Sequence, residues 1–151
     1  MPAPEELKTA VAALSKLVGV EFAVTDDVVA GTQLYVVYSL EHELPDRYNQ
    51  PTGVLGFRVP SNYPDVSPED VFFLQTAEPL KLGAPDAIRN SADLHRASVN
   101  GDFLTGTVLS NRPALVFSWH LWDRSPWNRR KHTLVDHYNH CLRRFEQPEH
   151  D

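Results

Sequence analysis

Cysteine is nearly absent from this chain of 151 residues, which contains only Cys141. One cysteine excludes an internal disulfide framework, and it excludes a zinc site built only from thiolates within one molecule. Long apolar runs are also missing, since no stretch approaches the roughly 18 residues of a membrane-spanning helix. Because residues 1–4 do not resemble the start of a signal peptide, we expect a soluble cytoplasmic protein without membrane contact.

Basic residues are scarce relative to acidic ones. Fourteen Lys and Arg stand against twenty Asp and Glu, and the formal net charge of -6 argues against nucleic-acid binding. Residues 1–75 carry four basic and eleven acidic side chains, whereas residues 76–151 carry ten and nine. Most of the late basic positions are Arg124, Arg129, Arg130, Lys131, Arg143 and Arg144. They form either a solvated face or a docking patch for an acidic protein surface.

The length and the hydrophobic fraction of 42% predict one domain, residues 1–151, with its own core. Apolar residues at spacings of three and four predict a helix over 4–18, ended by Gly19. β-Branched and aromatic residues predict four strands, over 20–25, 33–40, 52–60 and 71–75. The connections between them are short, which favours an antiparallel meander.

Residues 76–113 show no sustained periodicity, so this range is either a functional loop or contains short hidden elements. A short buried run is predicted at 114–117, and a final helix over 129–145. The apolar stripe of that helix consists of Leu134, Tyr138, Cys141, Leu142 and Phe145. The predicted fold class is therefore α+β, with an N-terminal helix, a four-stranded antiparallel meander, a long irregular crossing and a C-terminal helix.

A tyrosine–proline pair and a tryptophan stand at informative places in this order. Tyr63-Pro64 follows the third predicted strand, Pro68 and the apolar fourth strand come next, and Trp127 precedes the last helix. In these features the chain resembles the ubiquitin-conjugating enzyme superfamily over nearly its whole length. The resemblance implies the UBC-like fold.

The superfamily's catalytic cysteine has no counterpart here. In the family it carries ubiquitin as a thioester about eight residues before that tryptophan, and the count back from Trp127 reaches Trp119. No cysteine occurs between Met1 and His140, and the family's His-Pro-Asn element is missing because the chain contains no His-Pro pair. Cys141 is a poor substitute, since a cysteine on an apolar helix stripe has a raised pKa.

Bacterial relatives of the superfamily that lack the cysteine accompany ubiquitin-like modifiers, activating enzymes and deconjugating proteases. The resemblance therefore implies a catalytically inactive adaptor, without a cofactor, that binds a ubiquitin-like modifier or its activating enzyme. The expected partner-binding residues are Tyr63, Pro64, Trp119, Trp122, Arg124 and Trp127. Tryptophan and arginine are favoured at interface hot spots, but the three tryptophans alternatively pack the long loop against the core.

Other functions stay open. Ser118 adjoins the expected nucleophile position, and with His120 and Asp123 it would serve an active conjugating enzyme that forms an oxyester. His137 and Cys141, four residues apart on the last helix, are the candidate ligands of a histidine-based metal-binding protein. A further hypothesis is that the chain is a plain interaction module without any link to modifiers.

Overall fold

The computed structural model describes residues 3–44, 51–74, 82–84, 87–89, 97–110, 114–117, 122 and 126–146, and of 82–84, 87–89, 97–99 and 144–146 it describes the backbone alone. The helices are α1 (Glu5–Val18) and α3 (Leu134–Glu146). The strands are β1 (Ala23–Val24), β2 (Leu34–Glu43), β3 (Thr52–Pro60), β4 (Glu69–Leu74), β5 (Leu82–Ala84), β6 (Ala87–Arg89), β7 (Ala97–Asn100) and β8 (Ala114–Phe117).

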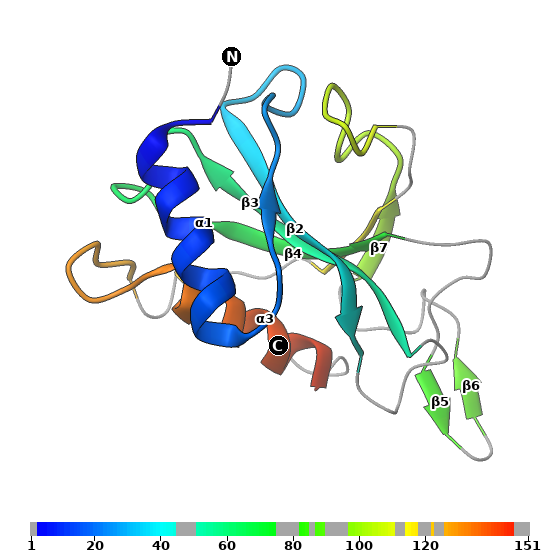
Figure 1. The fold of residues 1–151 in the computed structure, drawn as a ribbon. Coiled ribbons are helices and arrows are strands. Elements are labelled where there is room, and N and C mark those ends of the chain that lie inside the picture. Colours follow the sequence, from blue (N-terminus) through cyan, green and yellow to red (C-terminus); the bar gives the residue numbers. More distant parts are fainter. Residues whose placement is uncertain are drawn as a thin grey trace.

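The main sheet has the strand order β1-β2-β3-β4-β8-β7, and all neighbours are antiparallel. β5 and β6 form a separate hairpin (Figure 1). The predicted α+β class and the meander of the first four strands are confirmed. The predicted strand number is wrong: β8 pairs with β4 and β7 pairs with β8, so the described part of the sheet has six strands. β5, β6 and β7 fall in the range 76–113, where elements of three or four residues are too short to show a period.

The strand predicted over 20–25 is much shorter in the structure, where β1 comprises two residues. The reason is local. The backbone N–H of Phe22 donates to Ser15 Oγ at 2.9 Å, so this part of the chain is held to the end of α1 instead of to β2. β1 therefore pairs with β2 through two residues only.

The last helix begins at Leu134 and not at Arg129 as predicted. Thr133 and Asp136 form a capping box at its start. The Thr133 N–H donates to Asp136 Oδ2 at 2.6 Å, and Thr133 Oγ1 accepts from the N–H of Val135 at 3.3 Å. These bonds satisfy groups that the first turn of a helix leaves without partners, and they fix the helix boundary.

Both faces of the sheet are covered, which explains the continuous apolar runs of its central strands. Odd-numbered residues of β3, β4 and β8 face the two helices, and even-numbered residues face the segment 101–110 on the other side. The helical-face core includes Leu7, Val11, Leu14, Leu55, Phe57, Val59, Val71, Phe73, Leu115, Phe117, Leu134, Tyr138 and Cys141. The opposite core includes Val36, Val54, Phe72, Leu74, Phe103, Leu104, Leu109 and Ala114. Each fully buried large side chain contributes about 1.5–3 kcal/mol to stability.

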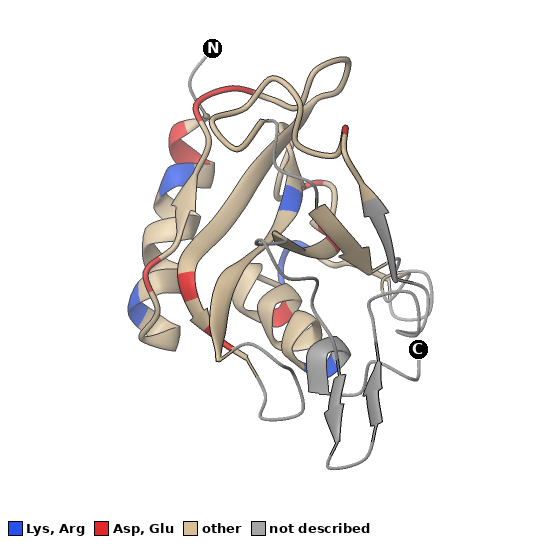
Figure 2. Cartoon of the chain, turned by 90° about the vertical axis from the view of Figure 1, so that its right-hand side faces the viewer, with Lys and Arg blue, Asp and Glu red and all other residues tan. Residues whose placement is uncertain are grey.

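α1 buries the apolar stripe that the sequence predicts and ends where predicted. Gly19 adopts a left-handed conformation with φ 71°, and its N–H donates to the carbonyl of Ser15 at 3.0 Å. The outer side of α1 carries both signs of charge (Figure 2). In the part of the chain that the structure describes, no helix is long and apolar enough to cross a membrane.

Candidate functional site

The Tyr63-Pro64 turn and Trp127, which the sequence singles out, are in direct contact. The indole N–H of Trp127 donates to the carbonyl oxygen of Pro64 at 2.7 Å, across 63 positions of sequence. The ring centroids of Tyr63 and Trp127 lie 5.8 Å apart. Tyr63 is only 9% exposed and belongs to the helical-face core, whereas Trp127 is half-buried. Tyr63 is therefore a packing residue, and Trp127 presents part of its ring to the surface.

Trp122 and His132 complete an aromatic group around Trp127. The Trp122 and Trp127 rings meet edge to face at 4.8 Å between centroids. The His132 ring lies 4.8 Å from Trp122 and 5.5 Å from Trp127. Trp122 and His132 are both half-buried. We refer to Tyr63, Trp122, Trp127 and His132 as the tryptophan cluster.

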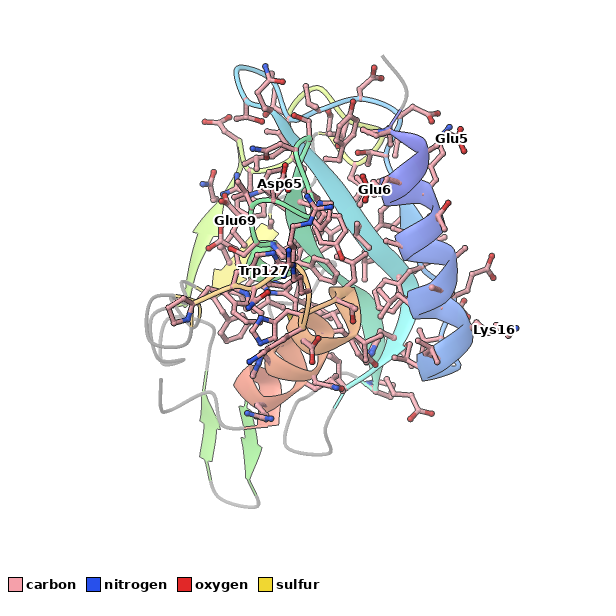
Figure 3. All side chains as sticks on the ribbon, turned by 90° about the vertical axis from the view of Figure 1, so that its left-hand side faces the viewer. Glu5, Glu6, Lys16, Asp65, Glu69 and Trp127 are labelled. Atoms are coloured by element: carbon pink, nitrogen blue, oxygen red, sulfur yellow. The ribbon has the colours of Figure 1, made fainter. Side chains whose placement is uncertain are left out.

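Charged side chains border the tryptophan cluster. Asp65 and Arg129 form an ion pair, and because both are exposed the pair adds little to stability. Arg130 and Lys131 follow and are also exposed. Figure 3 shows Asp65 on the same side of the molecule as Trp127, far from the end of α1. Beyond the ion pair, Arg130 and Lys131 therefore supply two positive charges next to the tryptophans in sequence.

His137 lies beneath Trp122 and uses both ring nitrogens. Its Nδ1 accepts from the indole N–H of Trp122 at 3.1 Å, and its Nε2 contacts the carbonyl oxygen of Asp70 at 2.9 Å. Because a carbonyl only accepts, the proton sits on Nε2. Burial lowers the pKa of His137 from 6.5 to about 4, so the ring is neutral at pH 7. No lone pair remains for a metal ion.

Cys141 is fully buried on the stripe of α3 where the sequence predicts it. Its Sγ lies 3.9 Å from the carbonyl oxygen of Asp70, the same atom that His137 contacts. Burial, and then the charge of Asp70, raise the pKa of the Cys141 thiol well above its ordinary value. A buried thiol with a raised pKa is a poor nucleophile and a poor metal ligand. Among the described residues, no three His, Cys, Asp or Glu side chains are grouped as a metal site requires.

The structure brings together four of the six expected partner-binding residues: Tyr63, Pro64, Trp122 and Trp127. The other two, Trp119 and Arg124, lie outside the described residues. The alternative catalytic residues Ser118, His120 and Asp123 lie outside them as well. The oxyester reading therefore stays a prediction from the sequence.

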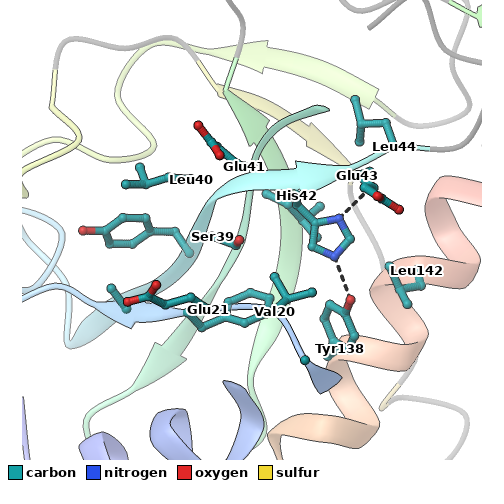
Figure 4. Close-up of a pocket in the computed structure, with 15 residues that line it drawn as sticks. Val20, Glu21, Ser39, Leu40, Glu41, His42, Glu43, Leu44, Tyr138 and Leu142 are labelled. Carbon is teal, nitrogen blue, oxygen red and sulfur yellow. Dashed lines mark hydrogen bonds between the residues drawn. The ribbon is translucent and has the colours of Figure 1, made fainter. Parts of the chain in front are cut away.

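An open groove that the sequence did not predict lies on the other side of α3, at the end of β2. It encloses about 1020 Å³ between residues 19–23, residues 38–44 and the side chains of Leu55, Tyr138 and Leu142. Figure 4 shows the His42 ring pointing from β2 across the groove to the hydroxyl of Tyr138 on α3.

The polar groups on the groove floor bond to each other. His42 Nδ1 donates to the carbonyl oxygen of Glu43 at 2.6 Å, which leaves Nε2 to accept from the Tyr138 hydroxyl at 2.7 Å. Burial lowers the pKa of His42. The sequence holds one signal for this site, since Ser39 and His42 are polar residues that follow an apolar run in the same strand. The structure buries both of them.

Comparisons of the chain with family models, with curated proteins and with solved structures found no match. The geometry of the site and the chemistry of its residues therefore carry the functional argument.

Proposed function

We propose that this protein is a ubiquitin-conjugating-like protein without a catalytic cysteine, which acts as a binding adaptor in a bacterial ubiquitin-like modification system. The observation that carries the proposal is the contact of Trp127 with the Tyr63-Pro64 turn. These are the features in which the sequence resembles the ubiquitin-conjugating superfamily, and a direct contact is expected if they belong to one framework. β8 and β7 lie beyond β4, so they extend the four-stranded meander without interrupting it.

The environment of the only cysteine supports a role without thioester chemistry. A thioester carrier needs an accessible thiolate, because the thiolate is the attacking species. Cys141 is fully buried and has a raised pKa, and residues 1–140 contain no other cysteine. An activating enzyme would have to reach through the helical-face core to load a modifier onto this chain.

The surface of the tryptophan cluster supports an adaptor role. Half-buried Trp122 and Trp127 combine a fixed apolar ring with a partly open face, as interface anchors do. Arg129 is paired with Asp65, and the exposed Arg130 and Lys131 that follow add positive charge beside them. This combination fits an acidic protein surface that contains a shallow apolar pocket.

Titration calorimetry tests the proposal, with the ubiquitin-like modifier and its activating enzyme from the same genome measured separately against this protein. We expect at least one of them to bind without ATP. Trp122→Ala removes an anchor and should weaken that binding by about tenfold or more. Arg130→Glu reverses one charge beside the cluster and should weaken it by about threefold.

Lys16→Glu is the matched control, because it makes the same charge reversal at an exposed position in the last turn of α1. It should leave the affinity unchanged. Binding of neither protein would overturn the adaptor role. An equal loss with Lys16→Glu and Arg130→Glu would overturn the placement of the binding surface at the tryptophan cluster.

A further inference from the structure

The groove at the end of β2 exists because two neighbouring strands separate there. β1 pairs with β2 only through Ala23 and Val24, which lie opposite Tyr38 and Val37, respectively. β2 continues to Glu43, and among the described residues its outer edge has no strand partner from Ser39 onward. An unpaired strand edge presents backbone N–H and C=O groups that can pair with another extended chain.

The floor of the groove consists of apolar side chains and of polar groups that are already hydrogen-bonded within the protein. The rings of Phe22 and Tyr138 meet edge to face at 5.4 Å between centroids, and Leu55 and Leu142 also line the groove. His42 engages both of its ring nitrogens within the protein. The floor therefore offers apolar surface and does not require a polar ligand group to satisfy it.

The rim of the groove is acidic. Glu21, Glu41 and Glu43 are exposed, and the described residues that line the groove include no Lys or Arg. Leu40 directly precedes Glu41 in the sequence and is 61% exposed. A register shift between Ser39 and His42 places Leu40 and Glu41 next to each other on the surface. Figure 4 shows Glu21 and Glu41 on opposite sides of Leu40.

We propose that this groove binds an extended, basic segment of a partner protein, which lies along the outer edge of β2. Main-chain hydrogen bonds to the open edge hold the segment, its apolar side chains cover Leu40 and the groove floor, and its Lys or Arg side chains meet the three carboxylates. A second copy of this chain is a poor occupant, because edge-to-edge pairing would bring two sets of glutamates together. This site is separate from the tryptophan cluster and does not depend on the role in a ubiquitin-like system.

Two labelled peptides of about ten residues test the proposal, long enough to run along the open edge. One alternates lysine and valine, and the other alternates glutamate and valine. Fluorescence anisotropy at low salt should show binding of the lysine peptide only, and added salt should weaken it. Backbone amide NMR signals of residues 19–23 and 38–44 should shift on binding.

The double variant Glu41→Gln/Glu43→Gln should weaken binding of the lysine peptide by about three- to tenfold. Glu5→Gln/Glu6→Gln removes the same charge from exposed positions on α1 and should change the affinity by less than about twofold. Equal binding of the two peptides, equal loss in the two double variants, shifts confined to other residues, or no binding of the lysine peptide would each overturn the proposal.

Discussion

The two sides of α3 differ in the contacts that their polar groups make. Toward β4, a chain of contacts runs from Trp122 through His137 to the carbonyl of Asp70, and Trp127 is bonded to Pro64. Toward β2, His42 and Tyr138 bond to each other below an open groove, where the edge of β2 has no strand partner among the described residues. The β4 side holds together residues that are far apart in the sequence. On the β2 side, the edge of the sheet stays unpaired within the part of the chain that the structure describes.

The comparison separates stability from binding. When one partner of a buried hydrogen-bonded pair is removed, the free energy of unfolding of the protein falls, because the other partner is left unsatisfied. Exposed charges on the rim contribute little to that free energy. We therefore expect the buried groups of the β4 side to contribute most to stability and pH dependence. The exposed rim of the groove on the β2 side should tolerate substitution and show its role only when a partner is present.

The largest change in the free energy of unfolding should come from lowering the pH. The pKa of His137 in the folded protein is lowered from 6.5 to about 4, so the folded chain binds fewer protons than the unfolded chain in this interval. Stability is fully present above pH 6.5 and falls as the pH drops toward 4, by about 3 kcal/mol from His137 alone. Burial lowers the pKa values of His42 and His140 too, which adds in the same direction.

Urea denaturation at a series of pH values measures this dependence, and His137→Gln is the informative variant. It removes the titrating group, so its stability should change less between pH 6.5 and 4 than that of the unmodified protein, whatever its stability at neutral pH. An unchanged pH slope in His137→Gln would show that His137 is not the buried neutral group described here.

A smaller effect is expected from Trp127→Phe. Phenylalanine keeps an aromatic ring beside Tyr63 but cannot donate to the carbonyl of Pro64. The free energy of unfolding at neutral pH should fall by about 1 kcal/mol, the contribution of one hydrogen bond. Denaturant titration at pH 7 measures it. A stability equal to that of the unmodified protein would mean that this bond does not hold the turn in place.

The smallest effect should come from the groove rim. Glu41→Gln/Glu43→Gln changes two exposed side chains, and its stability should stay within about 0.5 kcal/mol of the unmodified protein. Denaturant titration under the same conditions gives the comparison. A loss as large as that of Trp127→Phe would show that the rim charges take part in folding, and it would remove the contrast between the two sides of α3.

Long, strongly patterned segments were predictable from the sequence. α1 and β3 lie where periodicity and turn residues predict them, because packing at these places agrees with local preference. The burial of Cys141 followed from its spacing on α3. The predicted start of α3 at Arg129 is wrong, because residues 129–133 are polar, the apolar stripe begins only at Leu134, and the capping box at Thr133 and Asp136 fixes the helix boundary there.

Features that depend on contacts between distant residues could not be predicted from the sequence. β8 was recognised as a buried run, but its pairing with β4 and β7 is set by the tertiary fold. The groove lies where the Phe22 N–H is bonded to Ser15 and β1 pairs with β2 through two residues only, and the sequence pattern shows neither contact. His137 looked like a metal ligand on the helix, and only its contacts with Trp122 and Asp70 reveal that both nitrogens are engaged.

The most direct test of the proposal that this chain carries no thioester is intact-mass spectrometry after incubation with the modifier, its activating enzyme and ATP. The account predicts that this chain gains no thiol-sensitive adduct while the activating enzyme becomes loaded with modifier. A modifier adduct on this chain that is released by an added thiol, and that is lost in Cys141→Ser, would contradict it.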